Sequence, residues 1–178
     1  AALFGESSGA VLALEAVLHG LPISRLACYE PPFYVYAGYP QRSADFTERF
    51  DALVADGRRG DAFELFMIEA VGVPAEAAAG ITEIPLWRAL ESVTHTISYD
   101  GLIMGDTQKG DPASLDRFQP ITIPTLVMVG SESPAYQHKA ARRLAEVLPT
   151  AQWQTVQGES HQYTALGIVQ ILRDFLSR

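Results

Sequence analysis

Hydrophobic and polar positions along this chain predict strands and helices in alternation. Residues 123–130 are almost continuously apolar, which is typical of a parallel strand covered on both faces. Residues 23–30 predict another strand, ended by Pro31-Pro32, and residues 152–156 alternate between apolar and polar, as in a half-buried strand. Because helical segments separate these strands, we expect an α/β fold with a parallel sheet and flanking helices.

Three helical segments accompany the predicted strands. Residues 10–18 are apolar almost all round, so we expect a helix buried within a larger structure. Residues 134–148 form an amphipathic pattern. A final helix follows residue 161, and its apolar positions are Leu166, Ile168, Val169, Ile171, Leu172 and Phe175.

The middle of the chain has a different character. From residue 33 to 119 it predicts helix after helix, with Ser43 and Asp61 as N-caps and Asp111-Pro112 opening a later helix. We therefore predict a partial α/β core, formed by residues 1–32 and 120–178, with an all-helical insert at 33–119.

Composition narrows the classes of partner. The chain has 178 residues and a formal net charge of −8, which argues against nucleic acid or an anionic membrane as a partner. No apolar run approaches the ~20 residues of a membrane span, and we expect a cytoplasmic protein. Cys28 is the only cysteine, which excludes an internal disulfide and a thiolate metal site. Nothing in the sequence implies a metal or another cofactor.

The first residues carry the strongest chemical motif. Gly5, Ser7 and Gly9 form a G-x-S-x-G pattern between a short apolar segment and the first helix, as in a nucleophile elbow. We expect both glycines to be required, because a side chain at either would collide with the strand or the helix. A serine hydroxyl needs a base within hydrogen-bond reach. Of the four histidines, His161 alone follows a strand into a short polar loop.

The order of elbow, helix, strand, helical insert, strand, helix, strand and loop histidine resembles the α/β-hydrolase fold superfamily. The resemblance covers the chain from Leu3 to Phe175 and corresponds to the C-terminal part of that fold. It implies a serine hydrolase in which Ser7 attacks, His161 is the general base, and the insert caps an acyl pocket. It also implies three or four strand-helix units before the elbow, about 80 to 100 residues. An N-terminal segment or a partner chain would complete the sheet, and if the chain begins at Ala1, the alternative is an inactive fragment of that enzyme.

Stabilisation of the oxyanion is predicted only in part. The backbone N–H of Ser8, the residue after the nucleophile, is the expected first donor. A second donor is needed for full effect, and removing one donor costs about 3 kcal/mol of transition-state stabilisation. Nothing in the sequence obviously supplies that second donor.

Two glutamates compete for the role of the acid that orients the histidine. The position that the family uses most often falls on Ser133, which we interpret as a helix N-cap before Pro134. Glu132 lies one residue earlier. Glu30 ends the strand after the elbow helix, a position that some lipase-like relatives use, and we expect Pro31 to hold it extended. We favour Glu30 over Glu132, and Asp100, Asp106 and Glu159 are weaker alternatives.

The substrate is predicted only by class. Phe33, Tyr34, Trp87 and Met104 are candidate binding residues, and such side chains indicate an apolar acyl or alkyl group. We therefore predict a carboxylesterase-like hydrolase that cleaves an ester or lactone of a small, largely apolar molecule. The alternatives are a pseudoenzyme that binds a ligand without turnover, and lyase or cofactor-free peroxidase chemistry on the same fold.

Overall fold

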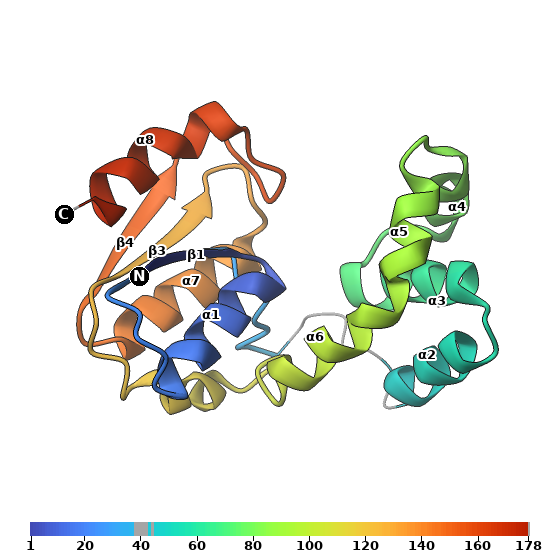
Figure 1. The fold of residues 1–178 in the computed structure, drawn as a ribbon, viewed down its shortest axis with the longest axis horizontal. Helices are drawn as coiled ribbons and strands as arrows, with labels where there is room; N and C mark the ends of the chain where they lie inside the picture. Colours follow the sequence, from blue (N-terminus) through green and yellow to red (C-terminus); the bar gives the residue numbers. More distant parts are fainter. Residues whose placement is uncertain (38–42, 44, 178) are drawn as a thin grey trace. The chain divides into compact units, whose positions relative to one another are not determined.

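A computed structural model describes residues 1–37, 43 and 45–177 and divides the chain into two compact units (Figure 1). The first unit combines Ala1–Tyr39 with Ile103–Arg178, and the second is Pro40–Leu102. Each unit is described by itself.

The first unit is built on a parallel sheet, as the strand pattern predicts. Its four strands lie in the order β1-β2-β3-β4, and each pairs in parallel with its neighbour. The predicted α/β class is therefore confirmed. The elements of this unit are β1 (Ala2–Glu6), α1 (Ser8–Leu18), β2 (Arg25–Tyr29), the 3₁₀ helix η4 (Pro112–Phe118), β3 (Thr125–Gly130), α7 (Ala135–Val147), β4 (Ala151–Val156) and α8 (Ala165–Leu176).

Helices cover both faces of this sheet, because successive strand residues point to opposite sides. In β2, Leu26 and Cys28 pack into the core formed with α1 and α7, whereas Ala27 and Tyr29 pack into the core formed with α8. Figure 1 shows α1 and α7 on one side of the strands and α8 on the other. The near-continuous apolar composition of the inner strands follows from this double coverage.

The pairing register brings the ends of the strands to one edge. Glu6 pairs with Tyr29 at the ends of β1 and β2, so the next residues, Ser7 and Glu30, leave the sheet side by side. Gly130 pairs with Val156 at the ends of β3 and β4. In an open parallel sheet, ligands bind outside these carboxyl ends.

Some predicted burial patterns are wrong. Residues Gln152, Trp153 and Gln154 of β4 are all exposed, so the predicted alternation is absent on this edge strand. The guanidinium carbon of Arg142 lies over the Trp153 ring, 5.6 Å from its centroid. In α1, which is predicted to be buried, Leu12 is 57% exposed. In α8, for which no burial is predicted, Leu166 and Val169 are 88 and 53% exposed.

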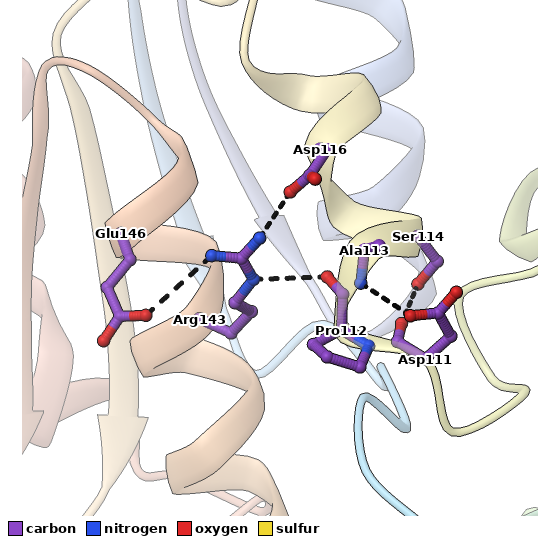
Figure 2. Close-up of polar contacts among 7 residues, drawn as sticks. All are labelled: Asp111, Pro112, Ala113, Ser114, Asp116, Arg143 and Glu146. Carbon is purple, nitrogen blue, oxygen red and sulfur yellow. Dashed lines mark hydrogen bonds and ion pairs between the residues drawn. The ribbon is translucent and has the colours of Figure 1, made fainter.

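Arg143 ties α7 to the segment that leads back into the sheet (Figure 2). Its Nε donates to the Pro112 carbonyl at 3.2 Å, and its other nitrogens bind Asp116 and, at 4.0 Å, Glu146. Asp111 caps η4 as predicted, because its carboxylate accepts a hydrogen bond from the Ala113 N–H at 2.9 Å. The segment is a 3₁₀ helix.

The second unit consists of helices joined by short turns, with no strand among its described residues. Its small core includes Phe46, Phe50 and Ala62. The elements are α2 (Phe46–Ala55), α3 (Arg59–Phe66), the π-helix η1 (Met67–Val71), α4 (Ala75–Ala79), the 3₁₀ helices η2 (Gly80–Glu83) and η3 (Thr94–Thr96), α5 (Trp87–Val93), and α6 (Ile97–Met104), which runs on into the first unit.

Two predicted N-caps in this unit are wrong. Asp45 precedes α2, while the Ser43 hydroxyl donates to Glu69. Asp61 lies inside α3, where its carboxylate accepts a hydrogen bond from Arg58 at 2.6 Å. In both places the polar group that the sequence pattern assigns to a helix N-terminus forms a hydrogen bond with another side chain instead.

The boundaries of the insert stay a prediction. The compact helical unit is narrower than residues 33–119, because Phe33, Met104, Leu115 and Phe118 pack in the core of the first unit. Residues 38–42 and 44 of the predicted insert lie outside the described residues. No helix among the described residues is long and apolar enough to cross a membrane.

Candidate active site

Ser7 sits on a sharp turn between β1 and α1. Its φ is 52° and its ψ −127°, a conformation that costs a non-glycine residue about 1–3 kcal/mol. The Ser7 N–H donates to the Tyr29 carbonyl at 2.9 Å, which holds the turn against the end of β2. This is the strand-turn-helix geometry that the motif predicts.

The two glycines of the motif differ in what they allow. A Cβ on Gly5 would lie 2.4 Å from the Gly9 carbonyl oxygen and 2.6 Å from the Ala10 Cα, so the close approach of strand and helix requires glycine. A Cβ on Gly9 would meet, apart from its own helix backbone, no atom of the described residues within 4 Å. The prediction of a collision is therefore confirmed for Gly5 and wrong for Gly9.

Glu30 leaves the end of β2 with its carboxylate fully buried. One oxygen, Oε1, accepts hydrogen bonds from the Gly130 N–H at 2.8 Å and from the Ser133 hydroxyl. The other, Oε2, contacts the Nδ1 of His161 at 2.8 Å. Each carboxylate oxygen therefore has a partner, as a buried charge requires.

The backbone of Glu30 differs from the extended form expected before Pro31. Its φ is +45°, in the left-handed region that non-glycine residues rarely adopt. Its N–H still continues the sheet ladder to the Met128 carbonyl at 3.1 Å. Pro31 favours an extended backbone at the residue before it. The hydrogen bonds of the Glu30 carboxylate outweigh this preference and offset the cost of the left-handed conformation.

His161 lies in the loop between β4 and α8, and its side chain is 43% exposed. Two hydrogen bonds to backbone carbonyls of the loop hold it against the ends of β2 and β3. The Tyr29 hydroxyl donates to the Ser160 carbonyl at 2.6 Å, and the Glu132 N–H donates to the Glu159 carbonyl at 2.9 Å. With Nδ1 occupied by Glu30, the Nε2 atom is the one left to meet a substrate or nucleophile.

Glu30 and His161 shift one another's pKa in the directions of an ion pair. Burial raises the pKa of Glu30, but the hydrogen bonds from His161, Ser133 and Gly130 outweigh it and leave the pKa below its ordinary value of 4.5. The hydrogen bond to Glu30 raises the pKa of His161 above 6.5, against the lowering effect of burial. The negative charges of Glu30 and Glu6 act in the same raising direction.

The structure brings Glu30 to His161 and leaves the other candidate acids elsewhere. Glu132 is exposed, and within the described part of the chain its carboxylate makes no hydrogen bond to His161. Asp106 is exposed, and Asp100 belongs to the second unit. The Glu159 carboxylate accepts hydrogen bonds from the N–H and hydroxyl of Thr164, at 2.8 and 2.6 Å.

Ser133 does not cap a helix as predicted. Pro134 precedes α7 without a side-chain cap, and the Ser133 hydroxyl is buried against Glu30 instead. Ser133, the position on which the family's usual acid falls, therefore contacts Glu30 directly. Sequence reasoning missed this contact because it joins residues 103 positions apart.

Ser8 begins α1, so its backbone N–H is among those that have no acceptor within the helix. This places the expected oxyanion donor directly beside Ser7. Among residues 1–37, 43 and 45–177, no group of three His, Cys, Asp or Glu side chains is arranged to hold a metal ion.

The four predicted binding residues occupy different environments. Phe33 is fully buried and stacks on Phe118 at 5.8 Å, and Met104 is 5% exposed in the same core. Tyr34 is half-buried, with its ring 5.5 Å from that of Tyr136. Trp87 belongs to the second unit, where its ring contacts Phe63. Their role toward a substrate stays a prediction.

The sequence of this chain matches no protein-family model and no curated protein. Its structure is similar to that of an α/β hydrolase from Sphaerobacter thermophilus DSM 20745, with 43% sequence identity and a TM-score of 0.88. This match covers 98% of the chain and 66% of the other protein.

More distant solved structures share the fold. A hydrolase from Oleispira antarctica and a thermophilic esterase are each 17% identical to the chain, with TM-scores of 0.60 and 0.59. Each match covers 99% of the chain, and 65% and 66% of those proteins respectively. The chain thus spans just under two thirds of the length of the structures it matches.

Proposed function

The chain belongs to the α/β-hydrolase fold superfamily, and on that premise we propose that it is a serine hydrolase with Ser7 as the nucleophile and His161 as the general base. The observation that carries this proposal is the contact of the buried Glu30 carboxylate with the Nδ1 of His161 at 2.8 Å. A carboxylate in this position selects the tautomer whose Nε2 can accept a proton, and it stabilises the imidazolium that forms.

The proposed reaction follows from these positions. The Ser7 Oγ attacks the substrate carbonyl while Nε2 of His161 takes the hydroxyl proton. The backbone N–H of Ser8 donates to the oxyanion that develops. His161 then returns the proton to the leaving alcohol, which departs and leaves an acyl group on Ser7. A water molecule, deprotonated by His161, hydrolyses this acyl-enzyme.

We assign the second hydrogen-bond donor to the oxyanion to none of the described residues. The N–H of Ser8 alone would leave the developing charge partly unstabilised, at a cost of about 3 kcal/mol. We propose that the segment which completes the sheet beside β1 supplies this donor. The proposal is supported by the position of β1, which within the described sheet pairs on one side only, with β2.

Hydrogen exchange on the full-length protein tests this completion of the sheet. Amides of β1 that point away from β2 should exchange slowly if a further strand, from an N-terminal segment or a partner chain, pairs with them. Fast exchange at those amides, beside slow exchange at the β2-facing ones, would show an open edge and refute the proposal.

For the substrate, we propose an ester or lactone with a small, largely apolar acyl or alkyl group. The support is the aromatic and methionine content of the segments after β2, including the half-buried ring pair of Tyr34 and Tyr136. Tyr34 follows Glu30 by four residues and Tyr136 lies in the first turn of α7. Both rings are therefore attached close to the sheet edge that carries the catalytic groups.

Hydrolysis of p-nitrophenyl esters and simple lactones by the full-length protein tests the function. We expect turnover of acetyl and butanoyl esters that is abolished in Ser7→Ala, with Ser92→Ala, at an exposed position of the second unit, as the matched control. Binding of such esters without turnover would favour the pseudoenzyme alternative. Lyase or peroxidase activity that depends on Ser7, with no esterase activity, would replace the proposed reaction while keeping its residues.

A further inference from the structure

Tyr163 and Glu6 join the histidine loop directly to the elbow. The Tyr163 hydroxyl donates to the Glu6 Oε2 at 2.8 Å. Tyr163 follows His161 by two residues, and Glu6, the last residue of β1, immediately precedes Ser7. Neither residue has a part in the reaction proposed above.

The ring of Tyr163 is held over the ends of two strands. Its centroid lies 4.8 Å from that of Tyr29, at the end of β2, and 6.4 Å from that of Phe4 in β1, both in edge-on geometry. Burial, together with the hydrogen bond to Glu6 and its charge, raises the pKa of Tyr163 to about 12. The hydroxyl therefore remains a donor at any pH at which a histidine base works.

The other contacts of this loop reach different elements. Tyr29 binds the Ser160 carbonyl from β2, and the turn after β3 binds the Glu159 carbonyl through Glu132. Glu30 binds His161 itself from the end of β2. Among these four contacts, the hydrogen bond from Tyr163 to Glu6 connects the loop to β1, the strand that ends directly before Ser7.

We propose that Glu6 and Tyr163 are a positioning pair, whose hydrogen bond sets the separation of the His161 ring from the Ser7 hydroxyl. This inference rests on the proposed function, because it presumes that the two side chains exchange a proton. Displacement of a catalytic group by 1 Å costs a rate factor on the order of 100. A charge-assisted hydrogen bond between the residues that flank base and nucleophile restricts such displacement.

Glu6 has a separable electrostatic effect. Among the described residues, the charged groups that act on His161 are Glu30 at the end of β2 and Glu6 at the end of β1. The groups that act on Tyr29, which binds the same loop, are Glu30, Glu159, Glu6 and the Tyr163 phenol. Of these, Glu30 and Glu6 raise the pKa of His161. Removal of the Glu6 charge should therefore extend activity to lower pH, whereas removal of the Tyr163 hydroxyl leaves that charge in place.

Steady-state kinetics of the full-length protein with p-nitrophenyl butanoate test the pair. Tyr163→Phe keeps the ring and its packing, and we expect it to lower kcat by about 10- to 100-fold with little change in KM. Tyr99→Phe is the matched control, since Tyr99 is 62% exposed in the second unit, and should leave kcat unchanged. The melting temperatures of both variants establish whether the fold is retained.

Variants of Glu6 test the same hydrogen bond at its other partner. Glu6 is exposed, so we expect these variants to fold. Glu6→Ala should lower kcat as much as Tyr163→Phe does, and the double variant should cost no more than either single change, because all three lose one interaction. Glu6→Gln retains an acceptor, so it should recover most of kcat while the acid limb of kcat/KM moves to lower pH.

Two outcomes would overturn the positioning pair. One is a folded Tyr163→Phe protein with unchanged kcat, and the other is a double variant whose losses are the product of the single ones. Both leave the proposed function standing. Ester hydrolysis that survives Ser7→Ala refutes the proposed function itself, and the two failures are thereby distinguished.

Discussion

At the scale of single residues, the site depends on a glutamate that breaks a backbone rule. Glu30 has a positive φ of 45° directly before a proline, and its carboxylate is completely buried. Both features are costly, and three hydrogen-bond partners on different elements offset them. Such a residue is expected at a functional site, where the orientation of the carboxylate matters more than its cost to the stability of the protein.

Replacement of the two candidate acids gives a direct comparison. We expect Glu30→Gln to lower kcat by a factor on the order of 10⁴, because the amide can no longer stabilise the imidazolium or fix the tautomer. Glu132→Gln, one residue from the usual acid position but exposed, should have little effect. Equal losses in both variants, measured as kcat on one ester, would contradict the assignment.

The pH dependence of activity follows from the raised pKa of His161. The base must be neutral to accept the serine proton, so kcat/KM should fall as pH drops below a value that lies above 6.5. In Glu30→Gln the residual activity should extend to lower pH, because the contact that raises the pKa is lost. A profile whose acid limb is unmoved by this change would argue against the contact.

Ser133 gives a stability prediction with a defined pH window. Ser133→Ala removes one donor from a buried carboxylate, and we expect a loss of about 1.5–3 kcal/mol in the free energy of unfolding near neutral pH. Since the pKa of Glu30 is lowered in the folded state, this contribution is present above pH 4.5 and is lost as pH falls through the folded pKa. Denaturant unfolding at several pH values measures it, and Ser133→Thr, which keeps the hydroxyl, is the control.

At the scale of elements, the elbow is a close contact between a strand and the helix that follows it. The contact is made at Gly5, where a Cβ would lie 2.4 Å from the Gly9 carbonyl oxygen, and Ser7 takes up the bend. The motif predicts this turn from sequence because its constraints are local. It does not reveal that Gly9 faces open space, since that depends on how α1 leaves the turn.

The two glycines therefore predict opposite outcomes for the same substitution. Gly5→Ala should destabilise the protein by about 3 kcal/mol, because backbone on both sides must move. Gly9→Ala should be neutral or stabilising by up to about 1 kcal/mol, as is usual for alanine in a helix. Unfolding free energies from denaturant titration compare them, and equal destabilisation would show that the elbow is packed differently.

At the scale of the whole molecule, the sequence predicts the parallel sheet, the order of its elements and the edge at which Ser7, Glu30 and His161 gather. These features follow from the hydrophobic pattern and from the rule that parallel strands end at one edge. The contacts that fix the site are harder to predict. Ser133 with Glu30 and Tyr163 with Glu6 join residues more than 100 positions apart, and no local pattern pairs them. Helix caps fail for a related reason, because Ser43 and Asp61 find tertiary or neighbouring partners.

The central claim, that Ser7 is a nucleophile activated by His161, is tested most directly by covalent labelling of the full-length protein with a serine-directed phosphonate. Mass spectrometry should locate the adduct on the peptide that contains Ser7, at a rate that falls steeply in His161→Ala, and Ser7→Ala should not be labelled. Absence of an adduct on Ser7, or a labelling rate unaffected by the loss of His161, would contradict this account.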